Sequence, residues 1–175
     1  MDMFRNNSDP IMFPNTNWDD FLFNKLAWQT QHNISVSGGA ERVRYFVSVG
    51  YLHQDGMLKS FENYNSNYLY NRYNYRANVD VDITPTTLLK LNIGGRVSQR
   101  HEPNGYGSNI WKYITWCTPF SSPGFIDGHY TRPVVGDYIP IGGGTSGLDL
   151  YYGYGYSEDT SNTLNLDIQL AQNLN

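Results

Sequence analysis

RYNYRANVDVDI, residues 72 to 83, alternates between polar and apolar side chains without a break. Its even positions are all polar or charged: Arg72, Asn74, Arg76, Asn78, Asp80 and Asp82. Its odd positions are all apolar or aromatic: Tyr73, Tyr75, Ala77, Val79, Val81 and Ile83. Successive side chains of a β-strand point to opposite faces, so this segment predicts a strand with one polar and one apolar face. Strands of soluble domains usually have about five or six residues, whereas a tilted strand needs roughly nine to eleven to cross a bilayer.

The same alternation recurs along the chain. Three further segments carry apolar rows at every second position: Val43 to Tyr51, Leu89 to Val97 and Leu164 to Leu170. A shorter one offers Ile34 and Val36 between polar neighbours. Together the patterns predict five strands, at roughly residues 32–39, 43–54, 70–83, 88–100 and 162–174.

The connections between these strands alternate in length. Short turns follow the first and third strands, near residues 40–42 and 84–87. Long segments, residues 56–68 and 102–161, follow the second and fourth strands. In an antiparallel up-and-down meander this places both short turns on one side and both long loops on the other, as in bacterial outer-membrane barrels. A short helix is expected near residues 18–25, with Asn17 as its N-cap, and a helical turn within residues 109–116.

The composition excludes several classes of protein. No run of eighteen apolar residues exists in the sequence, so a transmembrane helix is excluded. The net charge of −4 gives no electrostatic basis for binding nucleic acid. Cys117 is the single cysteine, and the four histidines have no second ligand at metal-binding spacing. No nucleophile motif or phosphate loop is present, so neither an enzyme nor a cofactor is expected.

Two blocks of sequence resemble a known family. Residues 31–59, QHNISVSGGAERVRYFVSVGYLHQDGMLK, are similar to the early barrel of the SusC/RagA-type TonB-linked (TonB-dependent) outer-membrane transporters. Residues 71–84 and 90–97, NRYNYRANVDVDIT and KLNIGGRV, resemble the next hairpin of that family. Asn17-Trp18 resembles the family's Thr-Asp-Trp, with Asn in place of Asp, and Ala40 stands where Thr is commoner.

The resemblance implies a 22-stranded transmembrane β-barrel in the bacterial outer membrane, with a plug domain inside it. It also implies import of oligosaccharides or peptides, driven by TonB through the plug, with a SusD-like surface lipoprotein as a lid. The expected partners are the remainder of the barrel and plug, that lipoprotein, TonB and outer-membrane lipid. The five strands would be part of the wall and would not insert alone as a working pore, because both sheet edges would be unpaired in lipid.

On this interpretation the chain has four parts. Residues 1–30 form an outer-loop segment leading into the barrel, and residues 31–100 form four barrel strands as two hairpins. Residues 101–161 form one long extracellular loop, and residues 162–175 form the fifth strand.

Two groups of residues are candidates for a site. The polar rows predict lumen-facing side chains: Arg72, Arg76, Asp80, Asp82, Lys90 and Arg96. The cations among them are expected to pair with plug carboxylates or with Asp80 and Asp82 across the hairpin, or alternatively to contact substrate. Aromatic residues of the long loop either bind a ligand or form the core of a folded loop, and the ligand-binding candidates are Trp111, Trp116, Tyr152 and Tyr154. A further group, Tyr51, Tyr68, Tyr70 and Tyr73, predicts an aromatic girdle at the membrane interface or, alternatively, sugar stacking.

Two other classes of protein remain open. A soluble or secreted carbohydrate-binding module would pack the apolar rows against a second sheet. A glycosidase would need two carboxylates at a defined separation across a cleft, for which Asp80 and Asp82 are the candidates.

Overall fold

The computed structural model describes residues 2–61, 67–104, 115, 117–131 and 155–174. The chain divides into two compact units. The first unit combines residues 1–27, 56–68 and 101–157, and the second combines residues 28–55, 69–100 and 158–175.

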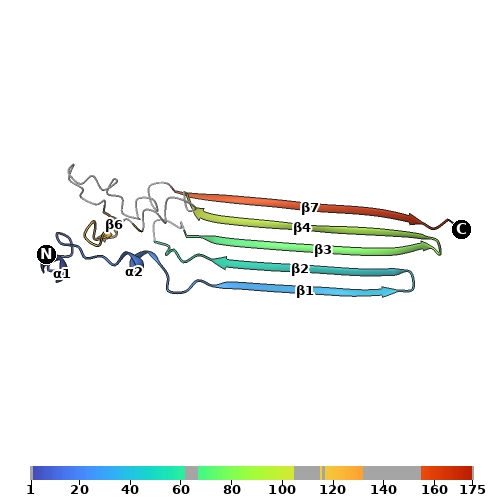
Figure 1. Ribbon diagram of the computed structural model, residues 1–175, viewed down its shortest axis with the longest axis horizontal. Coiled ribbons are helices and arrows are strands. Elements are labelled where there is room, and N and C mark those ends of the chain that lie inside the picture. The colour runs from blue at the N-terminus through green and yellow to red at the C-terminus, as the bar shows by residue number, and fades with distance from the viewer. Residues whose placement is uncertain (1, 62–66, 105–114, 116, 132–154, 175) are drawn as a thin grey trace. The chain divides into compact units, whose positions relative to one another are not determined.

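The second unit is a single five-stranded sheet (Figure 1). Its strands lie in the order β1-β2-β3-β4-β7, and they are β1 (Gln29–Ala40), β2 (Val43–Asp55), β3 (Leu69–Thr84), β4 (Thr87–Pro103) and β7 (Tyr156–Gln172). Neighbouring strands run in opposite directions (Figure 1). The prediction of an all-β, antiparallel up-and-down meander of five long strands is therefore confirmed.

The last strand is longer than predicted. It begins at Tyr156 rather than near residue 162. The added residues, YSEDTS, have no alternation of polar and apolar side chains, so no sequence period marks them as a strand. Pairing with β4 explains the extension, because the guanidinium of Arg100 lies 3.6 Å from the carboxylate of Asp159.

The register joins the apolar rows of β1, β2 and β3 on one face. Ile34 lies opposite Val49, and Val49 lies opposite Tyr75. Val36, Val47 and Ala77 follow one another across the sheet in the same way. A slip of one residue would turn each row to the opposite face, so the two-residue turn at residues 41–42 that sets the β1–β2 register also sets which face is apolar.

Side-chain contacts fix the alignment of β4 with β7. Thr87 bonds to Gln172, and Asn92 donates to Asp167 at 3.2 Å. Arg100 and Asp159 form a third contact of this kind. Across the three contacts the residue numbers decrease along β7 as they increase along β4, so the two strands are antiparallel. The same alignment places Leu91 opposite Ile168 and Ile93 opposite Leu166, so these apolar rows also meet.

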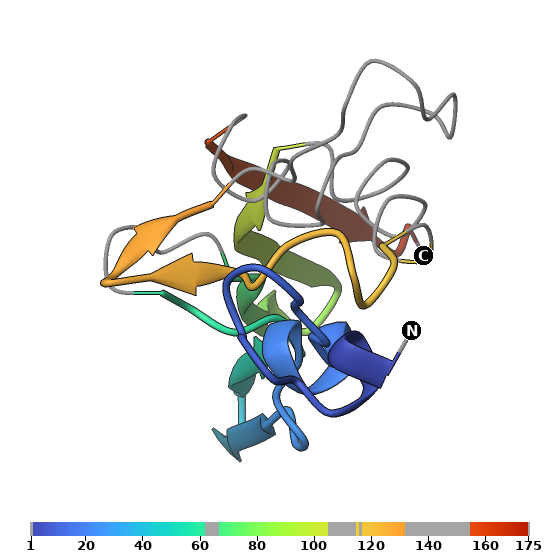
Figure 2. The same cartoon turned by 90° about the vertical axis from the view of Figure 1, so that its left-hand side faces the viewer.

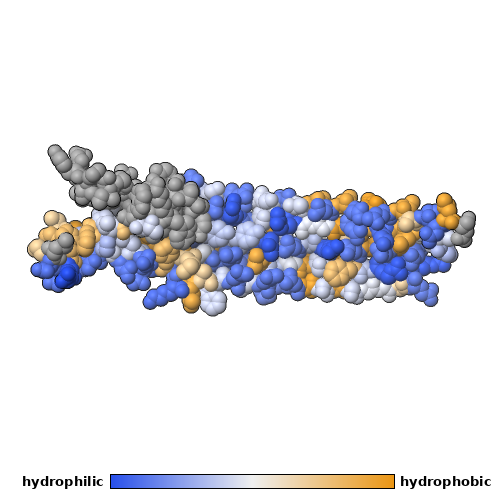
Figure 3. Space-filling model, in the orientation of Figure 1, coloured by the Kyte–Doolittle hydropathy of each residue, from blue (hydrophilic) through white to orange (hydrophobic). Residues whose placement is uncertain are grey.

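No second layer covers this apolar face among the described residues. Val49 is 55% exposed, Leu166 is 60% exposed and Ile34 is 72% exposed. In the space-filling view, hydrophobic residues gather over the half of the sheet that ends in the hairpin turns, with hydrophilic residues between them (Figure 3). The sheet therefore has no hydrophobic core of its own.

The first unit has a small aromatic core. It contains α1 (Asp2–Arg5), α2 (Trp18–Leu22), β5 (Phe125–Ile126) and β6 (His129–Tyr130). The side chain of Asn17 accepts a hydrogen bond from the backbone N–H of Asp20, which confirms the predicted N-cap. Phe21 stacks on Phe61 and on Phe125, with ring centroids 5.6 and 5.7 Å apart, so three distant segments meet at one side chain.

A short hairpin in this unit was not predicted. Figure 2 shows β5 and β6 as two orange arrows. Ile126 pairs with His129, and the two residues between them, Asp127 and Gly128, have φ of 50° and 75°. Asp-Gly with both φ positive is the sequence preferred in a type I′ turn. The helical turn predicted within residues 109–116 lies almost wholly outside the described residues.

The two helices in the described part of the chain are four and five residues long. None of the described helices has the length and apolar character needed to cross a membrane.

Two adjacent glycines of β4 give a matched test of the sheet. A Cβ at Gly95 would meet the ring of Tyr75 and lie 2.6 Å from the carbonyl oxygen of Thr163 on β7, whereas a Cβ at Gly94 would meet nothing nearer than 3.8 Å. We expect Gly95→Ala to lower the free energy of unfolding by about 1–3 kcal/mol through overpacking, and Gly94→Ala to leave it nearly unchanged. Urea unfolding in detergent micelles, followed by tryptophan fluorescence, measures both. Equal stability of the two variants would contradict the packing of Tyr75 over Gly95.

Candidate functional site

The apolar face changes in chemistry along β2 and β3. From the turn end, directly opposed pairs on this face are first mainly aliphatic, then aromatic, then polar: Val43–Val81, Tyr45–Val79, Val47–Ala77, Val49–Tyr75, Tyr51–Tyr73 and His53–Asn71. Because all these side chains lie on one face, the change marks a boundary across the face rather than a difference between faces.

Aromatic rings form that boundary. Tyr51 and Tyr73 stack with ring centroids 5.0 Å apart, and the ring of His53 follows Tyr51 at 6.5 Å. Tyr51 and Tyr73, two of the four tyrosines predicted to form an aromatic girdle, are a direct cross-strand pair in this register.

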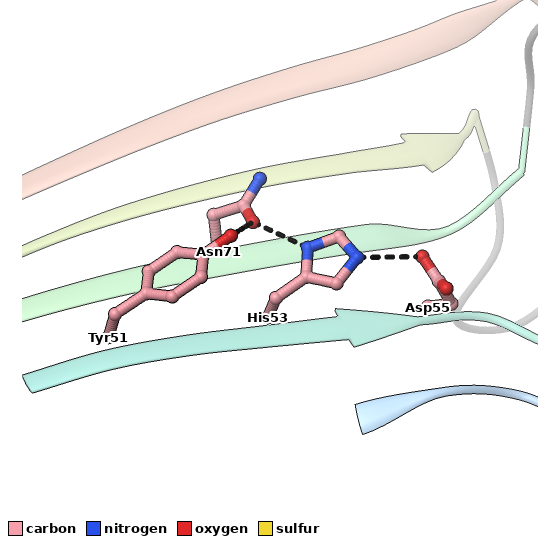
Figure 4. A network of polar contacts seen from close by, with 4 residues as sticks. All are labelled: Tyr51, His53, Asp55 and Asn71. Atoms are coloured by element: carbon pink, nitrogen blue, oxygen red, sulfur yellow. Dashed lines mark hydrogen bonds and ion pairs between the residues drawn. The ribbon is translucent and has the colours of Figure 1, made fainter. Parts of the chain in front are cut away.

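A network of polar contacts lies immediately beyond the rings (Figure 4). The hydroxyl of Tyr51 donates to Oδ1 of Asn71 at 3.2 Å. The same oxygen lies 2.7 Å from Nδ1 of His53, whose Nε2 lies 3.0 Å from Oδ1 of Asp55. These groups are half-buried. The apolar row therefore ends at polar side chains that form hydrogen bonds with one another.

The predicted lumen-facing residues all lie on the alternate, polar rows of β3 and β4. Asp82 forms an ion pair with Arg44 of β2 at 3.7 Å. The two side chains are 59% and 35% exposed, so the pair contributes under about 1 kcal/mol. In the described part of the chain, none of the four predicted cations lies within ion-pair distance of a carboxylate: Arg72, Arg76, Lys90 and Arg96.

A hollow interrupts this polar face beside Gly94. It has a volume of about 590 Å³, and Arg76 and Arg96 line it from neighbouring strands. Asparagine amides complete much of its polar lining: Asn78, Asn92 and Asn165. The lack of a side chain at Gly94 leaves this space open. Sequence alternation found the arginines but not the hollow, which depends on how β3, β4 and β7 are aligned.

The aromatic candidates of the long loop, Trp111, Trp116, Tyr152 and Tyr154, lie outside the described residues. The described part of that loop contributes Phe125 to the aromatic core and buries Ser122, whose hydroxyl contacts the hydroxyl of Thr131 at 2.9 Å. Cys117 is half-buried and forms no disulfide with a described residue. No group of three or more metal-ligating side chains occurs within the described ranges.

Two tyrosine variants distinguish the contribution of the polar network to stability from the contribution of ring stacking. Tyr51→Phe removes the hydroxyl that donates to Asn71 and keeps the ring, so we expect a loss of about 0.5–1.5 kcal/mol in stability. Tyr73→Phe is the matched control, because its hydroxyl makes no hydrogen bond to a described residue. Thermal unfolding of both variants in one detergent measures the difference. Equal stability of the two variants would show that the polar network does not contribute to the free energy of unfolding.

Comparison with curated proteins finds relatives of one kind. Two come from Formosa agariphila: TonB-dependent receptor P26, 29% identical over 108 residues, and TonB-dependent receptor P3, 30% identical over 136 residues. The TonB-dependent receptor SusC of Bacteroides thetaiotaomicron is 26% identical over 138 residues. The three alignments cover 59%, 71% and 62% of this chain.

The matched region is a small part of each relative. The alignments cover 10%, 12% and 13% of the three relatives, so the chain spans about a tenth of their length. No family model matches the chain. The chain is thus similar in sequence to a short stretch of TonB-dependent receptors.

Proposed function

We propose that this chain forms part of the barrel wall of a TonB-dependent outer-membrane transporter of the SusC/RagA type, which imports oligosaccharides or peptides. The apolar face of the sheet contacts lipid, and the polar face lines the lumen. The observation that carries the proposal is the change from aliphatic to aromatic to polar pairs along one face of β2 and β3.

The length of the apolar row fits the thickness of a membrane. Val43 and Tyr51 are separated by about 27 Å along the strand, at about 3.4 Å for each residue. A strand tilt of about 40° reduces this to roughly 20 Å of depth, close to the apolar band of about 25 Å seen in outer-membrane barrels. The Tyr51–Tyr73 pair then lies where amphipathic rings are favoured, at the boundary with the headgroups.

The strands are longer than the membrane requires. β2 and β3 have 13 and 16 residues, whereas crossing needs roughly nine to eleven. The excess carries the polar contacts of His53, Asn71 and Asp55, which we place beyond the acyl chains. Acyl chains would also remove the cost of exposing the apolar row to water, about 25 cal/mol for each Å².

The sheet needs neighbours to function. β1 and β7 are its two edge strands, and an unpaired edge is not tolerated within lipid. We therefore propose as partners the remainder of the barrel and its plug, a SusD-like surface lipoprotein, TonB acting through the plug, and outer-membrane lipid. The relatives are named as receptors, which agrees with a role that performs no chemistry on the substrate.

The alternative, a soluble carbohydrate-binding module, requires a second sheet over the apolar face. The exposure of Val49 and Leu166 disfavours it, because both side chains would be buried in a sandwich.

Nitroxide labels at adjacent positions of β2 test the proposal. In the intact protein with Cys117→Ser, single cysteines replace Val47, Ser48 or His53 and are labelled. Val47 and Ser48 lie on opposite faces, whereas His53 lies on the face of Val47 but beyond the tyrosines. We expect the Val47 label to be accessible to oxygen, which concentrates in lipid, and shielded from a water-soluble nickel chelate. The His53 label should be accessible to the chelate, and the Ser48 label should show low oxygen access.

A Val47 label shielded from both reagents would overturn the proposal, because it would place a protein layer over this face. A Val47 label accessible to the chelate would also overturn it, because it would place the face in water.

A further inference from the structure

We propose that the hollow beside Gly94 binds a saccharide that carries a carboxylate, and that Arg76 and Arg96 bind this carboxylate. This rests on the proposed function, because it takes the polar face of the sheet as the lining of a transport lumen. Beyond the proposed function, it states that the polar face of the sheet selects substrates that carry a negatively charged group.

The two arginines provide the charge. They reach the hollow from β3 and β4, and both side chains are exposed. The Nε of Arg76 lies 3.3 Å from Oδ1 of Asn78, which orients the guanidinium without neutralising it. Neither arginine has a carboxylate partner in the described part of the chain. A guanidinium binds carboxylate oxygens through paired N–H donors, so two of them at one hollow favour an anionic group.

The acid beside the hollow is already engaged. Oδ2 of Asp167 accepts hydrogen bonds from the amide of Asn92 at 3.2 Å and from the amide of Gln169 at 2.8 Å. Two cations therefore line the hollow with one carboxylate. This balance disfavours a metal ion or a cationic ligand and favours an anion.

The rest of the lining suits sugar hydroxyls. Beside the hydrogen bonds above, Asn78 keeps its amide N–H donors and Asn92 its amide oxygen, and Asn165 offers an amide group that both donates and accepts. The volume of about 590 Å³ lies within the range of about 300–1,000 Å³ typical of small-ligand sites. A single carboxylate side chain from a plug domain would fill only a small part of that space, which favours a saccharide as the occupant.

The experiment uses digalacturonic acid as the probe and its dimethyl ester, in which both carboxylates are esterified, as the uncharged control. Isothermal titration calorimetry on the intact protein in detergent micelles measures both. We expect the acid to bind and the ester to bind at least about tenfold more weakly, as the loss of a charged hydrogen bond predicts. Arg76→Gln and Arg96→Gln should each weaken binding of the acid by about tenfold or more. Gly94→Val, which keeps both arginines and fills the hollow, should weaken it as well.

Lys90→Gln is the matched control, because Lys90 is a cation on the same row of β4 that does not line the hollow. It should bind the acid as the unaltered protein does. Several results would overturn the proposal: no binding of the acid, equal binding of acid and ester, or equal weakening by Lys90→Gln.

A plug carboxylate in the hollow would give a distinct result that also overturns the proposal. Arg76→Gln and Arg96→Gln would then lower the unfolding midpoint while digalacturonic acid fails to bind. The membrane proposal is tested separately. Binding of the acid together with a shielded Val47 label would reject the barrel wall and leave the saccharide site in place.

Discussion

The pairing of β2 with β3 is the constraint on which the other features depend. On one face the apolar residues of β2 oppose those of β3, and on the other face the polar row of β3 meets a mainly polar row of β2. The exceptions on that second face are Phe46, opposite Asn78, and Leu52, opposite Arg72. Because side chains alternate with a period of two, this register produces two continuous surfaces of opposite character. It also places Tyr51 beside Tyr73, which creates the boundary between the apolar and polar parts of one face.

The two units are stabilised in different ways. In the first unit, Trp18, Leu22 and Leu58 are buried, and stacked phenylalanines connect segments that are far apart in the sequence. In the sheet, Leu52 is the buried large apolar side chain among the described residues. Backbone hydrogen bonds hold the strands together, and most large side chains of the apolar face stay exposed. The sheet therefore depends on its surroundings for the free energy that a packed core supplies to other domains.

Sequence alternation predicted the parts of the fold that have a strict period. The strand from Leu69 to Thr84 and the apolar row of β4 follow directly from it. It missed the start of β7 because the residues after Tyr156 carry no period, and there the partner strand decides. The Asp127-Gly128 hairpin was missed although its dipeptide is a strong turn signal, because the two-residue strands beside it are too short to show alternation. The Tyr51–Tyr73 pair and the hollow beside Gly94 depend on which strands are adjacent, and no single strand contains that information.

The apolar face, which the described residues leave uncovered, also affects how the sequence can change during evolution. Protein interiors are close-packed, so a change of one methylene in a buried side chain disturbs the packing of its neighbours. Fluid acyl chains would adapt to valine, leucine or isoleucine alike, so selection on such a surface would preserve hydropathy and period and leave side-chain volume free to change. Related walls would then keep their alternation long after most residues had been exchanged, which agrees with relatives that share 26–30% of residues with this chain.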